Sequence, residues 1–274
     1  MQTETKRPIC LTIAGLDPSG GAGIIADIKT FSAFGCFATA ALASVTFQNT
    51  TGVFGTVHQT AESVCKQIEP ILDDFDVAAV KTGMLPTREI IETVAAIIAE
   101  RKLKNVVVDP VVRSTSGFDL IDDAALAALI EKLFPLANLI TPNIPEAERI
   151  AQIEIENRDD IEEAAAIMYA MGARNVLIKG GHFGQMNSEK GKVNSQTRKA
   201  TDYLFVGRDM MVFETEYIET TATHGTGCTL AAAIAANLAL GNDLPESVRI
   251  AKDFVTEAIR TAPNIGKGHS PINI

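Results

Sequence analysis

The sequence predicts an α/β protein with three layers, in which helices cover both faces of a central, mostly parallel sheet. Short apolar runs alternate along the chain with longer segments of helical period. The apolar runs are continuous, as in ICLTIAG and NVVVDP, and such runs are typical of strands that are covered on both faces. Strand–helix alternation favours right-handed βαβ units, and therefore this architecture.

Each expected element follows from its local pattern. Continuous apolar runs predict strands at 9–15, 77–81, 105–110, 136–143 and 175–181. Helical periodicity predicts helices at 21–34, 87–101, 122–133, 144–151, 159–171, 227–240 and 244–261. Residues 202–214 are expected to form a hairpin around Gly207, and the polar stretch 183–200 a loop, either a mobile lid or a plain surface insertion. No linker or internal repeat divides the 274 residues, so one domain over 1–274 is expected.

Composition excludes several classes of protein. The chain has 24 Lys and Arg against 34 Asp and Glu, a net charge of −10, which argues against a nucleic-acid binder. An apolar content of 46% excludes a disordered chain. No signal peptide and no apolar run of about 18 residues is evident, so no membrane span is expected. Four cysteines without CxxC or zinc-type spacing predict reduced thiols and a cytoplasmic location.

The motif THGTGC at 223–228 carries the strongest chemical signal. Its two glycines and the small-residue helix that follows leave backbone N–H groups directed at one place, which suits a phosphate or a developing oxyanion. Cys228 stands at the start of that helix, where the helix dipole is expected to lower its pKa below about 8.5 and make it a base or nucleophile. The glycine segment can instead be a turn that lets the following helix pack tightly, and Cys228 can instead be a small buried residue without a chemical role.

Further polar residues stand where predicted strands end. The turn GLDPSGGAGIIAD (15–27) joins a strand to a helix but matches neither a Walker A loop nor the dinucleotide fingerprint. Asp109 and Glu146 are expected at the carboxyl edge of the sheet, where an acidic pair can hold Mg²⁺ through water, although each can also be a helix cap or a surface acid. Lys179 ends a buried strand and needs an anionic partner. Together these groups suit phosphoryl transfer.

Several segments occur in an order that carries a family resemblance. They are AGLDPSGGAGIIADIKTFSAFG (14–35), QNT (48–50), KTGML (81–85), VVVDPV (106–111), LITPNIPEAE (139–148), LIKGGH (177–182), DYLF (202–205), THGTGC and the tail GKGHSPIN (266–273). In this order the chain resembles the hydroxymethylpyrimidine/phosphomethylpyrimidine kinases of thiamine biosynthesis, members of the ribokinase-like superfamily. One departure is Leu16, where many members carry Thr or Ser.

The resemblance implies a ribokinase-like α/β/α domain, a set of cofactors and a set of residue roles. ATP with Mg²⁺ would phosphorylate 4-amino-5-hydroxymethyl-2-methylpyrimidine and then its monophosphate, in a cytoplasmic homodimer; a monovalent cation is a further candidate cofactor. Most of the superfamily has an Asp base where this family has Cys, here Cys228. The implied residues are Gly225, Thr226, Gly227 and Cys228 for catalysis; Gly15, Asp27, Gln48, Met84 and Val111 for the pyrimidine; Asp109, Asn143, Glu146, Lys179 and Thr226 for ATP and phosphate; and Asp109 and Glu146 for Mg²⁺.

Two other functions stay open at this point. A pyridoxine or pyridoxal kinase shares the motif set, and its substrate also carries a hydroxymethyl group on a six-membered heteroaromatic ring. A catalytically inactive pyrimidine sensor would use the same fold, but it is expected to have lost Cys228, Asp109 or the glycine loop, all of which are present. His182 and His224 are left unassigned, and the other three cysteines are expected to be structural.

Overall fold

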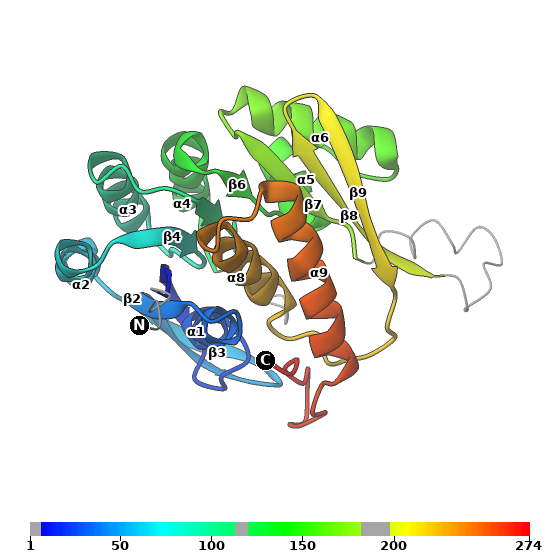
Figure 1. Ribbon diagram of the computed structural model, residues 1–274, viewed down its shortest axis with the longest axis horizontal. Coiled ribbons are helices and arrows are strands. Elements are labelled where there is room, and N and C mark those ends of the chain that lie inside the picture. Colours follow the sequence, from blue (N-terminus) through cyan, green and yellow to red (C-terminus); the bar gives the residue numbers. More distant parts are fainter. Residues whose placement is uncertain (1–6, 113–119, 182–197) are drawn as a thin grey trace, which may run out of the picture.

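One sheet of nine strands runs through the part of the chain that the computed structural model describes, residues 7–112, 120–181 and 198–274 (Figure 1). Its order is β3-β2-β1-β4-β5-β6-β7-β8-β9. The neighbours from β2 to β7 pair in parallel, whereas β3 at one edge and β8 and β9 at the other are antiparallel. The strands are β1 (Ile9–Leu16), β2 (Phe37–Asn49), β3 (Gly52–His58), β4 (Val77–Thr82), β5 (Val106–Val108), β6 (Leu139–Ile140), β7 (Asn175–Lys179), β8 (Lys199–Val206) and β9 (Asp209–Glu216).

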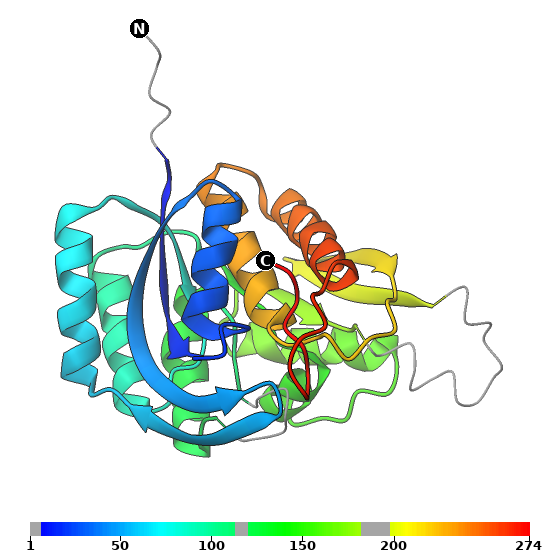
Figure 2. The same ribbon diagram turned by 90° about the horizontal axis from the view of Figure 1, so that it is seen from below.

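Helices cover both faces of this sheet. One layer consists of α1 (Gly23–Ala33), α8 (Thr226–Ala239) and α9 (Leu244–Arg260), which lie together at the front in Figure 2. The other layer consists of α2 (Ala61–Asp74), α3 (Arg88–Glu100), α4 (Asp123–Ala128), α5 (Ile144–Ala151) and α6 (Arg158–Ala170). A π turn and a 3₁₀ turn continue α4 through 129–136. The expected three-layer architecture is confirmed.

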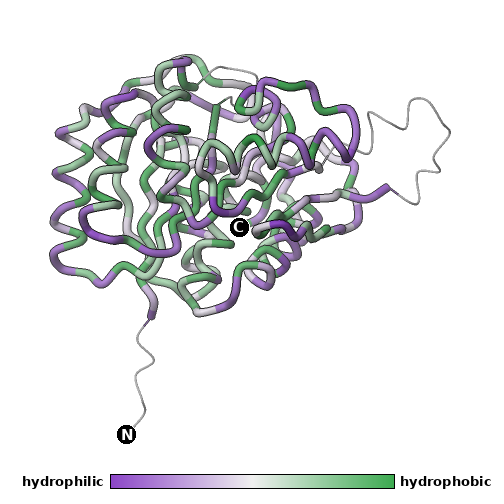
Figure 3. Tube along the Cα trace, turned by 90° about the horizontal axis from the view of Figure 1, so that it is seen from above, coloured by the Kyte–Doolittle hydropathy of each residue, from purple (hydrophilic) through white to green (hydrophobic). Residues whose placement is uncertain are grey.

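Two hydrophobic cores lie between the layers, one on each face of the sheet. The central strands are buried on both faces, and β5 is buried along its whole length. Figure 3 shows the same division, with hydrophobic residues inside and hydrophilic residues on the outer helices. α8 is buried nearly all round because its small Ala and Gly residues let the neighbouring helices approach. That position brings its N-terminus to the edge where the parallel strands end.

Most of the described α-helices have a side chain that caps their N-terminus, whereas two do not. Side chains of Thr60, Thr87, Asp122, Asn143, Asn157 and Asp243 accept backbone N–H groups at the starts of α2 to α6 and α9. Among the α-helices in the described residues, α1 and α8 lack such a cap. Both begin at the carboxyl edge of the parallel strands, so no capping side chain stands between their first turns and a ligand at that edge.

Some elements differ from the sequence prediction. The five expected parallel strands and the hairpin around Gly207 are confirmed, since β8 and β9 pair from Val206 and Asp209 outward. No strand was expected between 37 and 58, where β2 and β3 lie, and α2 was not expected either. Most of the polar stretch 183–200 lies outside the described residues, so the choice between a lid and a surface insertion stays a prediction. None of the helices in the described ranges is long and apolar enough to span a bilayer.

Candidate active site

A pocket of about 880 Å³ opens at the carboxyl edge of the parallel strands, beside the N-termini of α1 and α8. This volume lies within the range of small-molecule sites. All but one of the expected site residues line it, namely Gly15, Gln48, Met84, Asp109, Val111, Asn143, Glu146, Lys179, Gly225, Thr226, Gly227 and Cys228. The exception is Asp27. The topology thus brings residues from both halves of the chain to one place.

The two glycine-rich segments touch each other at the floor of the pocket. Gly225 has a φ of +89°, and a Cβ there would overlap the carbonyl oxygen of Gly21. A Cβ on Gly227 would lie 3.2 Å from Nζ of Lys179. Glycine is therefore required at 225 for conformation and contact together, and the absence of a side chain at 227 leaves room for Lys179 beside the backbone.

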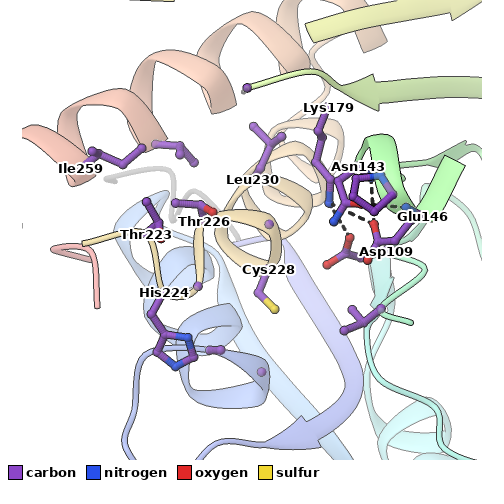
Figure 4. A pocket seen from close by; sticks show the side chains of 18 of the residues that line it. Asp109, Asn143, Glu146, Lys179, Thr223, His224, Thr226, Cys228, Leu230 and Ile259 are labelled. Carbon is purple, nitrogen blue, oxygen red and sulfur yellow. Dashed lines mark hydrogen bonds and ion pairs between the residues drawn. The ribbon is translucent and has the colours of Figure 1, made fainter. Parts of the chain in front are cut away.

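Cys228 lies in the first turn of α8 and faces the centre of the pocket (Figure 4). The Lys81 ammonium and the backbone of Gly23 lower the pKa of its thiol. Burial nevertheless raises the pKa of the thiol to about 11, although Lys81 and Gly23 act in the opposite direction. The expected lowering of this pKa is therefore wrong for the protein without ligands, because the effect of burial is larger than that of Lys81.

Asp109, Glu146 and Lys179 form a charged cluster on the opposite side of Cys228 from His224 (Figure 4). Nζ of Lys179 lies 2.9 Å from Oδ1 of Asp109 and 4.0 Å from Oε2 of Glu146. Burial raises the pKa of Glu146 to about 7, with Lys179 opposing and Asp109 reinforcing that rise. These carboxylates raise the pKa of Lys179 in turn, against burial, so it remains an ammonium.

Asn143 and Glu146 also form a capping box at the start of α5. The Asn143 side chain accepts from the Glu146 N–H, and the Glu146 carboxylate accepts from the Asn143 N–H, both at 2.8 Å. The box fixes the Glu146 carboxylate at the pocket wall. The described residues hold no group of three or more side chains that could cage a metal. A pair of carboxylates fits Mg²⁺, which keeps several waters and takes few protein ligands when it also binds phosphates.

Asp27 does not line the pocket, and its direct contact with the pyrimidine stays a prediction. Its side chain is fully buried behind Lys81, with Oδ2 at 2.9 Å from Nζ of Lys81 and 2.6 Å from the hydroxyl of Thr12. Lys81 lines the pocket and Asp27 raises its pKa against the effect of burial, so the ammonium persists beside Cys228. Asp27 can therefore act on a ligand through Lys81.

The other end of the pocket holds Gln48 and residues that sequence reasoning missed. Met84 packs against Gly15, where a Cβ would lie 3.1 Å from its sulfur. His224 contacts both Gln48 and Asp17. The signals were present, since His224 belongs to the THGTGC motif and Asp17 opens the first glycine-rich turn, but a lone His or Asp in a loop has no partner that the sequence reveals.

An apolar wall completes the pocket on the side of α9. Leu230, Val255 and Ile259 line it together with Ile218, which follows β9. Such a surface suits a planar base, because aromatic and aliphatic groups cover its faces without needing hydrogen bonds. The charged cluster of Asp109, Glu146 and Lys179 and the first turn of α8 line the same pocket.

Comparison with known proteins agrees with this geometry. The model of the phosphomethylpyrimidine kinase family matches residues 17–273. A hydroxymethylpyrimidine/phosphomethylpyrimidine kinase of Haemophilus influenzae is 44% identical over 265 residues, covering 96% of this chain and 95% of the relative. The thiamine biosynthesis bifunctional protein ThiED of Geobacter sulfurreducens is also 44% identical, and the match covers 96% of this chain but 51% of that longer protein.

Solved structures share the fold over nearly the whole chain. A phosphomethylpyrimidine kinase from Clostridium difficile has a TM-score of 0.78 and 40% identity, covering 92% of this chain and 100% of that one. An ADP complex of Bacillus subtilis pyridoxal kinase has a TM-score of 0.85 and 38% identity, covering 97% of each chain. The fold and the pocket thus define a small-molecule phosphotransferase of the ribokinase-like class. Within that class, the chain belongs to the phosphomethylpyrimidine kinase family.

Proposed function

We propose that the protein transfers phosphate from ATP to the hydroxymethyl group of 4-amino-5-hydroxymethyl-2-methylpyrimidine and then to the resulting monophosphate, in thiamine biosynthesis. The observation that carries this proposal is the position of Cys228, between His224, which contacts Gln48, and the pair formed by Asp109 and Lys179 (Figure 4). Residues 1–274 would act as one kinase domain. Relatives that match nearly the whole chain carry this function in their names.

Gln48 and its neighbours would bind the pyrimidine. An amide both donates and accepts, so it can bond a ring nitrogen and an adjacent amino group at once. Gly15, Met84 and Val111 supply the apolar surface around the ring. Binding in this manner holds the hydroxymethyl group near Cys228, where positioning alone lowers the barrier to reaction.

Cys228 would take the hydroxyl proton as the oxygen attacks the γ-phosphorus. Lys81 favours the thiolate, since it is the largest charge that lowers the Cys228 pKa. The bond from the hydroxyl oxygen to phosphorus forms, the bond to the ADP oxygen breaks, and the proton ends on sulfur. A neutral thiol in the empty site means that only a small fraction of the free enzyme carries the base at neutral pH.

The backbone N–H groups at the start of α8 and Lys179 would stabilise charge on the transferred phosphoryl group. Removing one such donor from an enzyme typically costs about 3–4 kcal/mol of transition-state stabilisation. Asp109 and Glu146 would hold Mg²⁺, through water, beside the phosphates. When bound, that ion neutralises phosphate charge and aligns the reacting oxygens. The apolar wall on α9 would receive the adenine.

We also propose that the enzyme is a cytoplasmic homodimer. Phe47 and Val57 are 52% and 51% exposed on one face of the β2–β3 hairpin. Phe47 pairs across the strands with Gly55, which has no side chain to cover the ring. Burying this apolar surface against a second copy would be favourable. The variant Phe47→Asp should shift light-scattering mass toward the monomer. The four cysteines are free thiols, as a reducing compartment requires.

A coupled ADP-release assay with separation of products tests the main proposal. Purified protein with Mg-ATP should release two ADP for each hydroxymethylpyrimidine, through the monophosphate to the diphosphate. Preferred turnover of pyridoxal in parallel reactions would move the substrate assignment to vitamin B6. Pyrimidine binding without turnover of either compound would identify a sensor instead.

A further inference from the structure

Asp17 and His224 form a buried pair beside Gln48. Nε2 of His224 lies 2.7 Å from Oδ2 of Asp17, and the two side chains are 7% and 3% exposed. The carboxylate also accepts the backbone N–H groups of Gly21 and Ala22. Burial by itself raises the pKa of Asp17, but hydrogen bonds from His224 and Ser19 outweigh it and hold the pKa below its usual range. An ionised carboxylate only accepts, so Nε2 of His224 carries a hydrogen.

The N–H of His224 indicates which atom of the Gln48 amide, oxygen or nitrogen, lies next to the imidazole ring. Nε2 of His224 lies 3.3 Å from Nε2 of Gln48, an arrangement in which two donors would face each other. A half-turn of the amide places its oxygen there instead, so that the N–H of His224, which donates to Asp17, faces an acceptor and no longer a second donor. Because the two ends of an amide are nearly identical in shape, the hydrogen-bond network decides between them.

Thr46 assigns the other end independently. Its Oγ1 lies 3.1 Å from the carbonyl oxygen of Leu16 and 3.0 Å from the far end of the Gln48 amide. A hydroxyl group has one hydrogen, and the Leu16 carbonyl can only accept it. Thr46 therefore accepts from Gln48, which requires the NH₂ group on that side. Both neighbours select the same orientation, with the oxygen toward His224.

We propose that His224, held by Asp17, and Thr46 are positioning residues that fix the Gln48 amide in one orientation and so determine which ring the pocket accepts. The second N–H of the Gln48 amide and the second lone pair of its oxygen then face the pocket, each at a fixed position. A ring nitrogen next to an amino group can satisfy both, whereas a pyridine ring without that amino group cannot. This inference rests on the proposed function, because it deepens the recognition of its substrate.

The C-terminal tail holds this arrangement together. The backbone of His224 donates to the carbonyl of Ser270 and accepts from Ile272, both at 3.3 Å. The same tail binds the turn that follows Gln48, where the His269 N–H lies 2.7 Å from the carbonyl oxygen of Thr50. Figure 2 shows the tail passing alongside the β2–β3 turn. Both sides of the Gln48–His224 contact are thus anchored to one segment.

The test measures ligand affinity in two pairs of variants. Thr46→Val removes the hydroxyl with little change of shape and Thr46→Ser retains it; His224→Leu removes the ring donor and His224→Gln offers an N–H at similar reach. Calorimetry gives Kd for hydroxymethylpyrimidine and, separately, for Mg-ATP. Loss of the orienting bond should raise the pyrimidine Kd about tenfold in Thr46→Val and His224→Leu, with less than about a twofold change for ATP. Thr46→Ser and His224→Gln should recover most of the affinity.

The preference between substrates gives a second readout. The ratio of kcat/KM for hydroxymethylpyrimidine to that for pyridoxal should fall about tenfold in Thr46→Val. Unchanged pyrimidine affinity, equal losses for pyrimidine and ATP, or no recovery in the conservative variants would overturn the inference. If His224→Leu does not fold, the Thr46 pair decides. Wild-type protein that binds the pyrimidine but does not phosphorylate it contradicts the proposed function alone, since the orientation of Gln48 is read from binding.

Discussion

Lys252 on α9 donates a hydrogen bond of 2.6 Å to Asp202 on β8, and both side chains are only 8% exposed. The other oxygen of Asp202 accepts the Gly180 N–H at 3.1 Å, so the pair also holds the turn that follows Lys179. Both residues line the pocket. A buried ion pair thus connects the edge hairpin, the final helix and the phosphate side of the site.

Removing one partner of this pair should destabilise the protein strongly. Lys252→Met leaves the Asp202 charge buried without its partner, and we expect a loss of about 3–5 kcal/mol in unfolding free energy, measured by urea denaturation. The double variant Asp202→Asn with Lys252→Met should recover part of that loss. Lys66→Met is the matched control, because the Lys66–Glu62 pair is 71% and 75% exposed. A control loss as large as that of Lys252→Met would contradict the prediction.

Cys228→Ala should abolish most turnover while the pyrimidine still binds. A positioned general base contributes about 10²–10⁴-fold to rate, so kcat should fall by at least about a hundredfold. The pyrimidine Kd should change by less than about threefold, because the thiol is not expected to bond the ring. Steady-state kinetics and calorimetry measure the two effects. Cys65→Ala on α2 is the control, and a near-normal kcat in Cys228→Ala would remove the base assignment.

The pH profile should carry the signature of a thiol with a raised pKa. Since the Cys228 pKa is about 11, the thiolate fraction of the free enzyme grows about tenfold per pH unit below that value. We expect log kcat/KM to rise with pH between about 7 and 9, and to fall more steeply below about 7 as Glu146 takes up a proton. Cys228→Asp should remove the alkaline rise and keep the acid limb. A wild-type plateau by about pH 8 would exclude a thiolate base of this pKa.

Gly225→Ala should inactivate the enzyme through the floor of the pocket. The new Cβ would overlap the Gly21 carbonyl oxygen, so both glycine-rich segments must shift. A positional error near 1 Å can cost about a hundredfold in rate, and kcat should fall by at least that factor. Gly207→Ala is the control, because Gly207 also has a positive φ of +62° but nothing within 4 Å of its Cβ. It should cost only about 1–2 kcal/mol of stability and leave kcat unchanged.

Sequence patterns predicted the parallel core because its strands are short, apolar and continuous. They did not predict β2, where ATAALASV mixes small and polar residues without a clear period, yet Ala41, Ala43 and Ser44 in this segment are buried. Tertiary contacts, rather than local propensity, make this segment a strand. α2 was not predicted for a different reason: it contains Pro70, and proline is unfavourable inside a helix.

Part of the candidate site could likewise be predicted from the sequence and part could not. Motif residues such as Asp109, Lys179 and Cys228 could be placed at strand and helix ends from the sequence. Pairings across long separations could not, because His224 meets Asp17 only after 207 positions of chain have folded. The Cys228 pKa was also out of reach, since the helix dipole is visible in the sequence but the extent of burial is not.

The neutral thiol of Cys228 has a consequence for the chemical durability of the enzyme. Peroxides and alkylating agents attack a thiolate far faster than a thiol. With its pKa near 11, Cys228 stays protonated at neutral pH while the pocket is empty. The sulfur on which turnover is proposed to depend is therefore a poor target for oxidants between catalytic cycles, and an idle enzyme should outlast peroxide exposure that damages more acidic cysteines.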